Sequence, residues 1–256
     1  MEPVGQILRD LCIQTLDAAA IPCVATMPAV PEICAHDGGI TIGVLGTLID
    51  VVGGTAAING VHPDWIATAD AAIHRFAPVT PGDHVTGAAR IVRRGTSTVV
   101  TEIDCTNGAN ELVANATMTF AVLPQAGQPA VLTPTRVSAP PEPERGLSGP
   151  LATDLGIEIV DDALLLPIAR RVRNPINALQ GGVVAMLHDL AATHAAGGGT
   201  VTELTISYLA PARVGPVRAI GTVHHHDPHR SVVGIECVDD GAEQRLSTRG
   251  TAVVAS

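Results

Sequence analysis

The chain has 256 residues, of which 46% are hydrophobic and 16% are charged, so it can bury a sizeable core in one or two domains. Its net charge of −10 argues against a nucleic-acid partner, because binding phosphates requires a basic face. The first residues lack a secretory pattern, no apolar run reaches the roughly 20 residues that span a bilayer, and the five cysteines form no CxxC pair. We therefore expect a cytoplasmic protein with buried free thiols and no membrane span.

In chain order, the first half predicts a short helix near 5–19, a strand near 21–30 and an apolar helix over 42–58. This helix carries Asp50 and is apolar almost all round, which is typical of a buried helix. Three or four Val- and Thr-rich strands follow, the last over 111–122, with Asn107-Gly108 in a hairpin turn. Residues 1–122 are therefore predicted to form one α+β domain, a buried helix within an antiparallel sheet.

Residues 123–147 contain six prolines and predict a linker. The second half, 148–256, repeats the order of the first: a weak helix near 148–155, a strand near 163–172, an apolar helix over 181–196 with Asp189, and a last strand over 245–255.

The two halves are also similar in sequence. Residues 73–78 match 206–211 at an offset of 133, whereas Asp50 and Asp189 are 139 positions apart. The first copy therefore has six extra residues between its helix and the next strand, around 59–63. Duplication is the most economical account of these matches.

The second copy resembles PaaI-type acyl-CoA thioesterases of the hotdog fold. Asn174, Gln180, the Gly181-Gly182 pair and Asp189 keep the spacing of that family's helix motif, with Gln in place of His, and 208–215 read Tyr-Leu-Ala-Pro-Ala-Arg-Val-Gly. The resemblance implies a double hotdog, in which the two copies pair within one chain and active sites lie between them. It also implies a homodimer of double hotdogs.

In this family one hotdog supplies the amide-rich helix start of a site and the other supplies the acid. The first copy has Ala35, Thr41 and Ile42 where the second has Asn174, Gln180 and Gly181. The amide side is therefore expected to survive only in the second copy. The acid should then be Asp50, joined by the hydroxyl residue Thr68, whose counterpart is Val201. One working site is therefore expected, with Gly182 as a substrate-binding residue and Asp189 as a remnant of the other site. Its expected catalytic residues are Asp50, Thr68, Asn174, Gln180 and Gly181.

The resemblance implies hydrolysis of acyl-CoA thioesters. The Gly181 amide would donate to the oxyanion, and the missing Cβ would let the acyl oxygen approach this amide closely. Asp50 would act as base or nucleophile, two routes that the sequence does not separate. Arg93, Arg94 and Arg230 are candidates to meet the phosphates of coenzyme A. Coenzyme A is part of the substrate, so no cofactor is expected.

A metal site is not expected, because His224 and His226 lack a third ligand at suitable spacing. Two other functions remain open. One is a non-catalytic protein that binds acyl-CoA or lipid. The other is a hotdog hydratase or dehydratase, although neither His62 nor His84 is spaced with a suitable Asp. The acyl chain and the carrier, coenzyme A or acyl carrier protein, are not set by the sequence.

Overall fold

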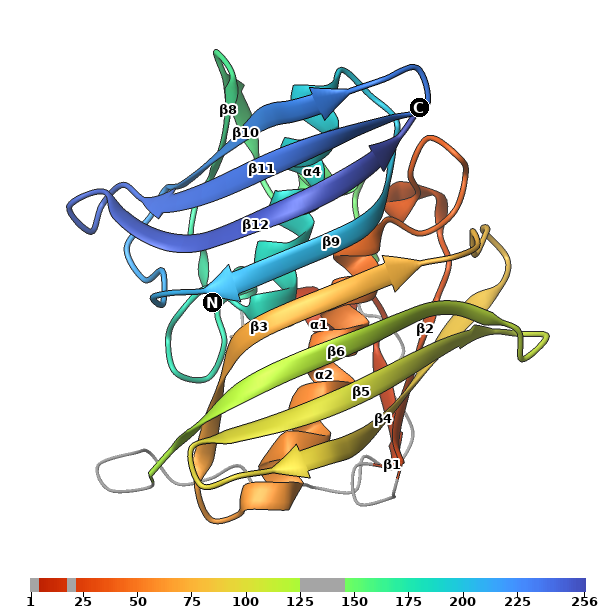
Figure 1. Ribbon diagram of the computed structural model, residues 1–256, viewed down its shortest axis with the longest axis vertical. Coiled ribbons are helices and arrows are strands. Elements are labelled where there is room, and N and C mark those ends of the chain that lie inside the picture. The colour runs from red at the N-terminus through yellow and green to blue at the C-terminus, as the bar shows by residue number, and fades with distance from the viewer. Residues whose placement is uncertain (1–4, 18–21, 125–145) are drawn as a thin grey trace.

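The computed structural model describes residues 5–17, 22–124 and 146–256 (Figure 1). Its helices are α1 (Gln6–Asp10), α2 (Ile42–Val61), α3 (Leu151–Asp154) and α4 (Gly181–Ala196), with 3-10 turns η1 (Pro31–Ile33) and η2 (Arg170–Val172). The strands are β1 (Gln14–Asp17), β2 (Cys23–Pro28), β3 (Trp65–Arg75), β4 (His84–Arg94), β5 (Thr98–Asn107), β6 (Leu112–Leu123), β7 (Glu158–Val160), β8 (Ala163–Leu166), β9 (Thr200–Tyr208), β10 (Val217–His226), β11 (Arg230–Asp239) and β12 (Arg245–Ala255).

The described strands form one continuous antiparallel sheet in the order β1-β2-β4-β5-β6-β3-β9-β12-β11-β10-β8-β7. The two copies meet at its centre, where β3 pairs with β9 and Ala72 lies opposite Thr205. These two residues are 133 positions apart, which is the offset of the repeat. The junction therefore relates the two copies by a local twofold axis, and the predicted double hotdog is confirmed.

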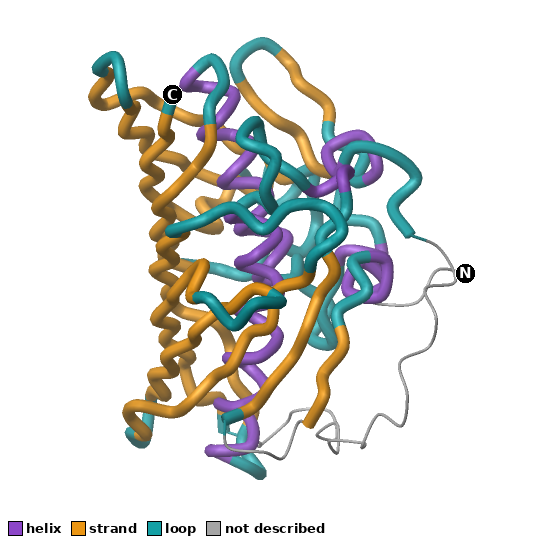
Figure 2. Tube along the Cα trace, turned by 90° about the vertical axis from the view of Figure 1, so that its right-hand side faces the viewer, coloured by secondary structure: helices purple, strands orange, loops and turns teal. Residues whose placement is uncertain are grey.

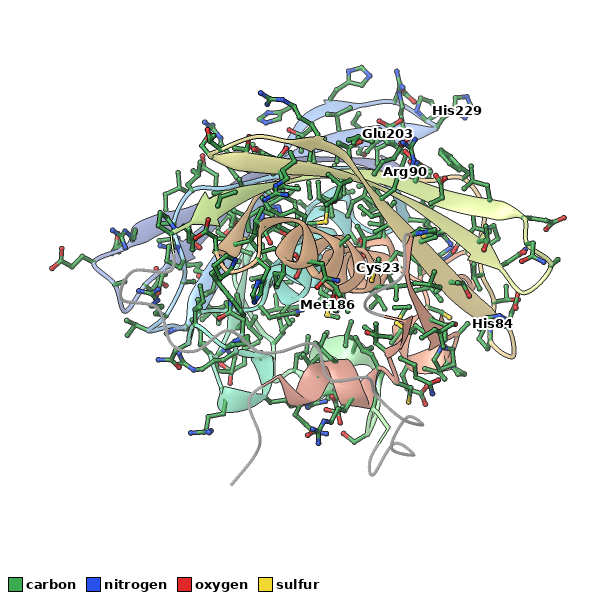
Figure 3. All side chains as sticks on the ribbon, turned by 90° about the horizontal axis from the view of Figure 1, so that it is seen from below. Cys23, His84, Arg90, Met186, Glu203 and His229 are labelled. Atoms are coloured by element: carbon green, nitrogen blue, oxygen red, sulfur yellow. The ribbon has the colours of Figure 1, made fainter. Side chains whose placement is uncertain are left out.

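The helices α2 and α4 lie side by side against one face of the sheet, and loops with α1 and α3 form a third layer (Figure 2). Met186 and Cys23 lie inside this arrangement, whereas Arg90 and Glu203 project from the outer face of the sheet (Figure 3). By length and composition α2 could cross a membrane, but 72% of its apolar window is buried within the fold. Its hydrophobicity is accounted for by the core that surrounds it.

Some local predictions were wrong. The N-terminal helix ends at Asp10 instead of extending to residue 19, and 14–17 form β1, which pairs with β2. The strand expected over 163–172 stops at Leu166 because Pro167, which lacks an N–H, cannot donate to the sheet. Extra residues in the first copy lengthen the helix, since α2 has 20 residues and α4 has 16. Of the predicted linker, 125–145 lie outside the described residues.

Glycines set the distance between α2 and α4. A Cβ on Gly43 would lie 2.6 Å from the Met186 Cα, and one on Gly182 would overlap the Thr47 Cα. The two backbones therefore meet directly at these points, which a side chain would prevent. At each of these two contacts, the first turn of one helix lies against the middle of the other helix.

This packing predicts opposite effects for two Gly→Ala changes within α2. Gly43→Ala should lower the free energy of unfolding by roughly 1–3 kcal/mol, because its methyl group overlaps α4. Gly54→Ala should raise it by about 0.5–1 kcal/mol, since Ala favours the helix and the nearest atom to the new Cβ, Phe120 Cε1, is 3.7 Å away. Urea unfolding followed by circular dichroism tests the pair. Equal effects would contradict direct backbone contact at Gly43.

Candidate active site

Asp50 lies in the middle of α2 and faces the start of α4 across the helix contact. Its Oδ1 accepts a hydrogen bond of 2.9 Å from the Thr68 hydroxyl on β3. The backbone N–H of Gly182, in the first turn of α4, also donates to this carboxylate. One group therefore joins both copies: the acid and hydroxyl come from the first, and the amide comes from the second.

The absence of a side chain at Gly181 makes room for this carboxylate. A Cβ at that position would lie 2.9 Å from Asp50 Oδ1 and 3.0 Å from Oδ2. The sequence suggested that Gly181 leaves space for the acyl oxygen, and the structure shows that it leaves space for the acid itself. The Gly181 N–H belongs to the first turn of α4, where backbone N–H groups have no intrahelical acceptor.

Burial raises the pKa of Asp50 to about 6, although the bonds from Thr68 and Gly182 favour its charged form. The residue nevertheless keeps some solvent-accessible surface. At neutral pH Asp50 is therefore a charged carboxylate that is more basic than an ordinary aspartate, on a residue that is only partly buried. Such a group is suited to take a proton or to attack a carbonyl carbon.

Gln180 is the N-cap of α4 and is 6% exposed. Its side chain does not cap the helix, and its Oε1 has no partner among the described residues. The equivalent residue in the first copy, Thr41, does cap its helix by accepting from the Val44 N–H at 3.3 Å. A buried amide oxygen without a partner is costly, which favours a role in binding a ligand.

Asn174 occupies a tight turn before α4, and its Oδ1 accepts from the Ala178 N–H at 2.9 Å. The first copy forms the same turn around Ala35, where the Ala35 N–H donates to the Gly39 carbonyl. Because the turn forms without an Asn there, local structure alone does not require Asn174. Its role at the site stays a prediction.

The reciprocal site, built around Asp189, keeps the same framework with different surroundings. The Gly43 N–H donates to Asp189 Oδ2 at 2.9 Å, and the Thr41 hydroxyl also bonds to this carboxylate. Burial raises the pKa of Asp189 to about 6 as well. However, Asp189 is only 5% exposed, and Ile42, which is fully buried, replaces Gly181. The two acids thus have similar basicity but different access.

The candidate phosphate-binding arginines lie at opposite ends of the sheet. Exposed Arg93 and Arg94 end β4, and the row of paired residues that starts at Arg94 leads through β5 and β6 to Thr68. Arg230 begins β11 at the other end, where it pairs with Asp227 at 3.6 Å. The structure therefore does not bring the three together.

Two contacts of the site were missed from the sequence. Gly182 was assigned to substrate binding, yet its N–H donates to Asp50. Tyr208 served only as part of the family motif, yet its hydroxyl donates to the Gly181 carbonyl at 3.0 Å. The position of Tyr208 at the end of β9, beside the glycine pair, could not be read from spacing alone.

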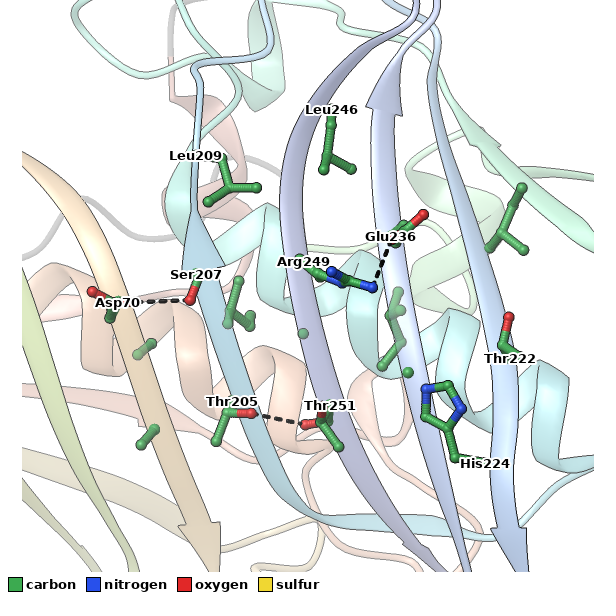
Figure 4. Close-up of a pocket in the computed structure, with 17 residues that line it drawn as sticks. Asp70, Thr205, Ser207, Leu209, Thr222, His224, Glu236, Leu246, Arg249 and Thr251 are labelled. Atoms are coloured by element: carbon green, nitrogen blue, oxygen red, sulfur yellow. Dashed lines mark hydrogen bonds and ion pairs between the residues drawn. The ribbon is translucent and has the colours of Figure 1, made fainter.

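A broad depression of about 910 Å³ lies elsewhere, on the outer face of the sheet (Figure 4). Its polar side chains bond to one another, as in the Ser207–Asp70 hydrogen bond of 2.8 Å and the Arg249–Glu236 ion pair of 3.3 Å. Asp50 is not among the residues that line it. The depression is therefore separate from the candidate active site.

Solved structures similar to this chain include three proteins of low sequence identity. The tesB protein of Mycobacterium avium subs paratuberculosis has a TM-score of 0.67 at 13% identity, with 99% of each chain covered. A Lactobacillus plantarum protein assigned as an oleoyl thioesterase has a TM-score of 0.66 at 13% identity, covering 94% of this chain and 99% of that one. An acyl-ACP thioesterase from Bacteroides thetaiotaomicron VPI-5482 has a TM-score of 0.58 at 10% identity, covering 91% and 97%.

These likenesses show the fold, and no curated protein matches the sequence. The sequence profile of the Thioesterase superfamily matches residues 40–114 and 179–245, one segment in each copy. Together these segments make up more than half of the chain. They contain both aspartate helices and the strands at the centre of the sheet. The protein therefore belongs to the thioesterase superfamily, with two hotdog repeats in one chain.

Proposed function

We propose that this protein hydrolyses acyl-CoA thioesters at a single composite site, with Asp50 as base or nucleophile and the Gly181 amide as oxyanion donor. The observation that carries the proposal is the placement of an accessible, basic carboxylate at the start of α4, held by Thr68 and by the Gly182 N–H. The superfamily membership supports hydrolysis of a thioester as the reaction.

In the base route, Asp50 takes a proton from water as the water oxygen attacks the thioester carbonyl carbon. The negative charge that develops on the carbonyl oxygen meets the Gly181 N–H at the positive end of the helix dipole. Collapse of the intermediate breaks the C–S bond, and the proton passes to the departing thiolate. The products are a carboxylic acid and free coenzyme A. In the nucleophile route, Asp50 attacks the same carbon, the C–S bond breaks, and coenzyme A leaves as its thiolate. Water then opens the resulting anhydride, which releases the acid, returns Asp50 as a carboxylate and supplies the proton that the thiolate takes up.

Gln180 completes the amide side of the proposed site. Its buried Oε1, without a partner among the described residues, can accept a hydrogen bond from the attacking water, and the Nε2 group can donate to the thioester. The coenzyme A moiety would extend toward Arg93 and Arg94, which lie at the same end of the sheet as Thr68. The predicted homodimer and the cytoplasmic location stay predictions.

Asp50→Asn should reduce hydrolysis of acyl-CoA by about 10²–10⁴-fold, because an amide neither accepts the proton nor attacks the carbonyl. Asp189→Asn should retain most of the activity, since that carboxyl is closed off by its neighbours. The measurement is release of free thiol from a panel of acyl-CoAs of different chain lengths. Loss of activity in Asp189→Asn alone would reverse the assignment. Binding without hydrolysis by the unmodified protein would support a non-catalytic acyl-CoA-binding function instead.

The pH dependence should follow Asp50, whose pKa of about 6 divides its inactive protonated form from its active ionised form. Below that pKa, kcat/KM should fall about tenfold for each pH unit, and above it should level off. Initial rates monitored by the loss of thioester absorbance give this profile without a thiol reagent. A profile that rises toward acid would exclude an ionised carboxylate as the reacting group.

Arg94→Gln should raise the KM for an acyl-CoA roughly three- to tenfold, because an exposed contact to a phosphate is worth on the order of 1 kcal/mol. The same variant should leave the KM for the matching acyl-pantetheine, which has no nucleotide, unchanged. Arg230→Gln, at the far end of the sheet, is the matched control and should affect neither substrate. An equal rise for both substrates would show that Arg94 does not act through the nucleotide.

A further inference from the structure

One peptide group links Tyr208 to the acid of the site. The Tyr208 hydroxyl donates to the Gly181 carbonyl oxygen at 3.0 Å, and the next N–H along the chain, that of Gly182, donates to Asp50. This carbonyl and this N–H belong to the same planar peptide unit. A donor on the carbonyl polarises the amide and strengthens the hydrogen bond made by its N–H. Tyr208 therefore acts on Asp50 through the peptide between Gly181 and Gly182.

The reciprocal site lacks this link although it keeps the amide donor to its acid. Its equivalent peptide joins Ile42 to Gly43, whose N–H donates to Asp189 at 2.9 Å. The residue 133 positions before Tyr208 is Arg75, at the end of β3. Its guanidinium turns to Asp37 instead, with Nη1–Oδ2 at 2.8 Å and Nη2–Oδ1 at 3.1 Å. The tyrosine link therefore distinguishes the accessible site from the closed one.

The surroundings of Tyr208 keep its phenol protonated and able to donate. Burial raises the pKa of Tyr208 well above its usual value, and the charge on Asp50 raises it further. Its neighbours are neutral as well: Thr248 lies opposite it on β12, and the buried Cys237 thiol, with a pKa of about 12, lies beyond on β11. From α4, His188 bonds to Thr248 at 2.8 Å and has a pKa lowered by burial to about 3.

Around Asp50 itself, the facing groups are Thr68 from β3, the Gly182 N–H from α4 and Tyr208 from β9. Among these groups and the neighbours of Tyr208, Asp50 alone has a pKa between 5 and 8 and so changes its charge in that range. A change in the acid limb of activity can therefore be traced to this carboxyl group.

We propose that Tyr208 is a positioning residue for Asp50, which fixes the Gly181–Gly182 peptide so that its N–H holds the reacting carboxylate. The inference rests on the proposed function only for its effect on catalysis. With the Gly182 N–H committed to Asp50, the Gly181 N–H remains for the oxyanion. Two successive N–H groups at the start of α4 thus bind the substrate and the acid: that of Gly181 binds the oxyanion and that of Gly182 binds Asp50.

The test is Tyr208→Phe, which removes the donor and keeps the ring. We expect kcat to fall about tenfold with little change in KM, and the acid limb of the pH profile to move to higher pH, because a weaker donor stabilises the carboxylate less. Thr68→Val, which removes a direct donor to Asp50, should shift the limb in the same direction. Asp37→Asn, which alters the partner of Arg75 in the other copy, is the matched control and should leave both kcat and the limb unchanged.

A direct titration of Asp50 separates this inference from the proposed function. Infrared difference spectra between each protein and its Asp50→Asn counterpart report protonation of that carboxyl without substrate. A higher pKa of Asp50 in Tyr208→Phe supports the positioning role even if no acyl-CoA is hydrolysed. An unchanged Asp50 pKa together with wild-type kcat in Tyr208→Phe overturns the positioning role. A loss of kcat that is explained by a lower unfolding temperature of this variant overturns it as well.

Discussion

The close, antiparallel contact between α2 and α4 is the constraint on which the site depends. Gly43 and Gly182 let the two backbones meet, and any side chain there would separate them. Because each contact sets the first turn of one helix against the middle of the other, each aspartate reaches the amides of the opposite copy. The acid can thus be buried and still have polar partners, a combination that raises its basicity while keeping it charged at neutral pH.

The two copies retain the same contact between aspartate and helix start, and they differ in the residues around it. Both aspartates retain an amide donor from the opposite helix, and burial raises both pKa values to about 6. The differences lie in what surrounds them: Gly181 against Ile42, and Tyr208 against Arg75. A raised pKa alone therefore does not distinguish the two acids of this protein. Access and the orientation of the adjoining peptide separate the two sites.

Much of the fold could be predicted because the repeat leaves clear marks in the sequence. The offset of 133 between 73–78 and 206–211 indicated the duplication, and the structure pairs the two strands that carry this match, β3 and β9, at the centre of the sheet. The family resemblance, transferred to the first copy by this offset, predicted Thr68 at the same site as Asp50, and the structure contains a hydrogen bond between the two. The N-terminal helix was overextended because the pairing of β1 with β2 is a tertiary interaction that local pattern does not reveal. The position of the Asp50 carboxylate beside Gly181 could not be predicted for a similar reason, since only the packing of α2 against α4 shows it.

A site with its acid in one repeat and its amides in the other also requires one copy of each repeat. Two first repeats would bring together two acids without a Gly181-Gly182 pair. Two second repeats would regain the glycines and Tyr208 but would have Val201 in place of Thr68. Joining one of each in a single chain gives the complementary halves a high effective concentration for each other. Within each molecule the acid therefore meets its amide partner regardless of dilution.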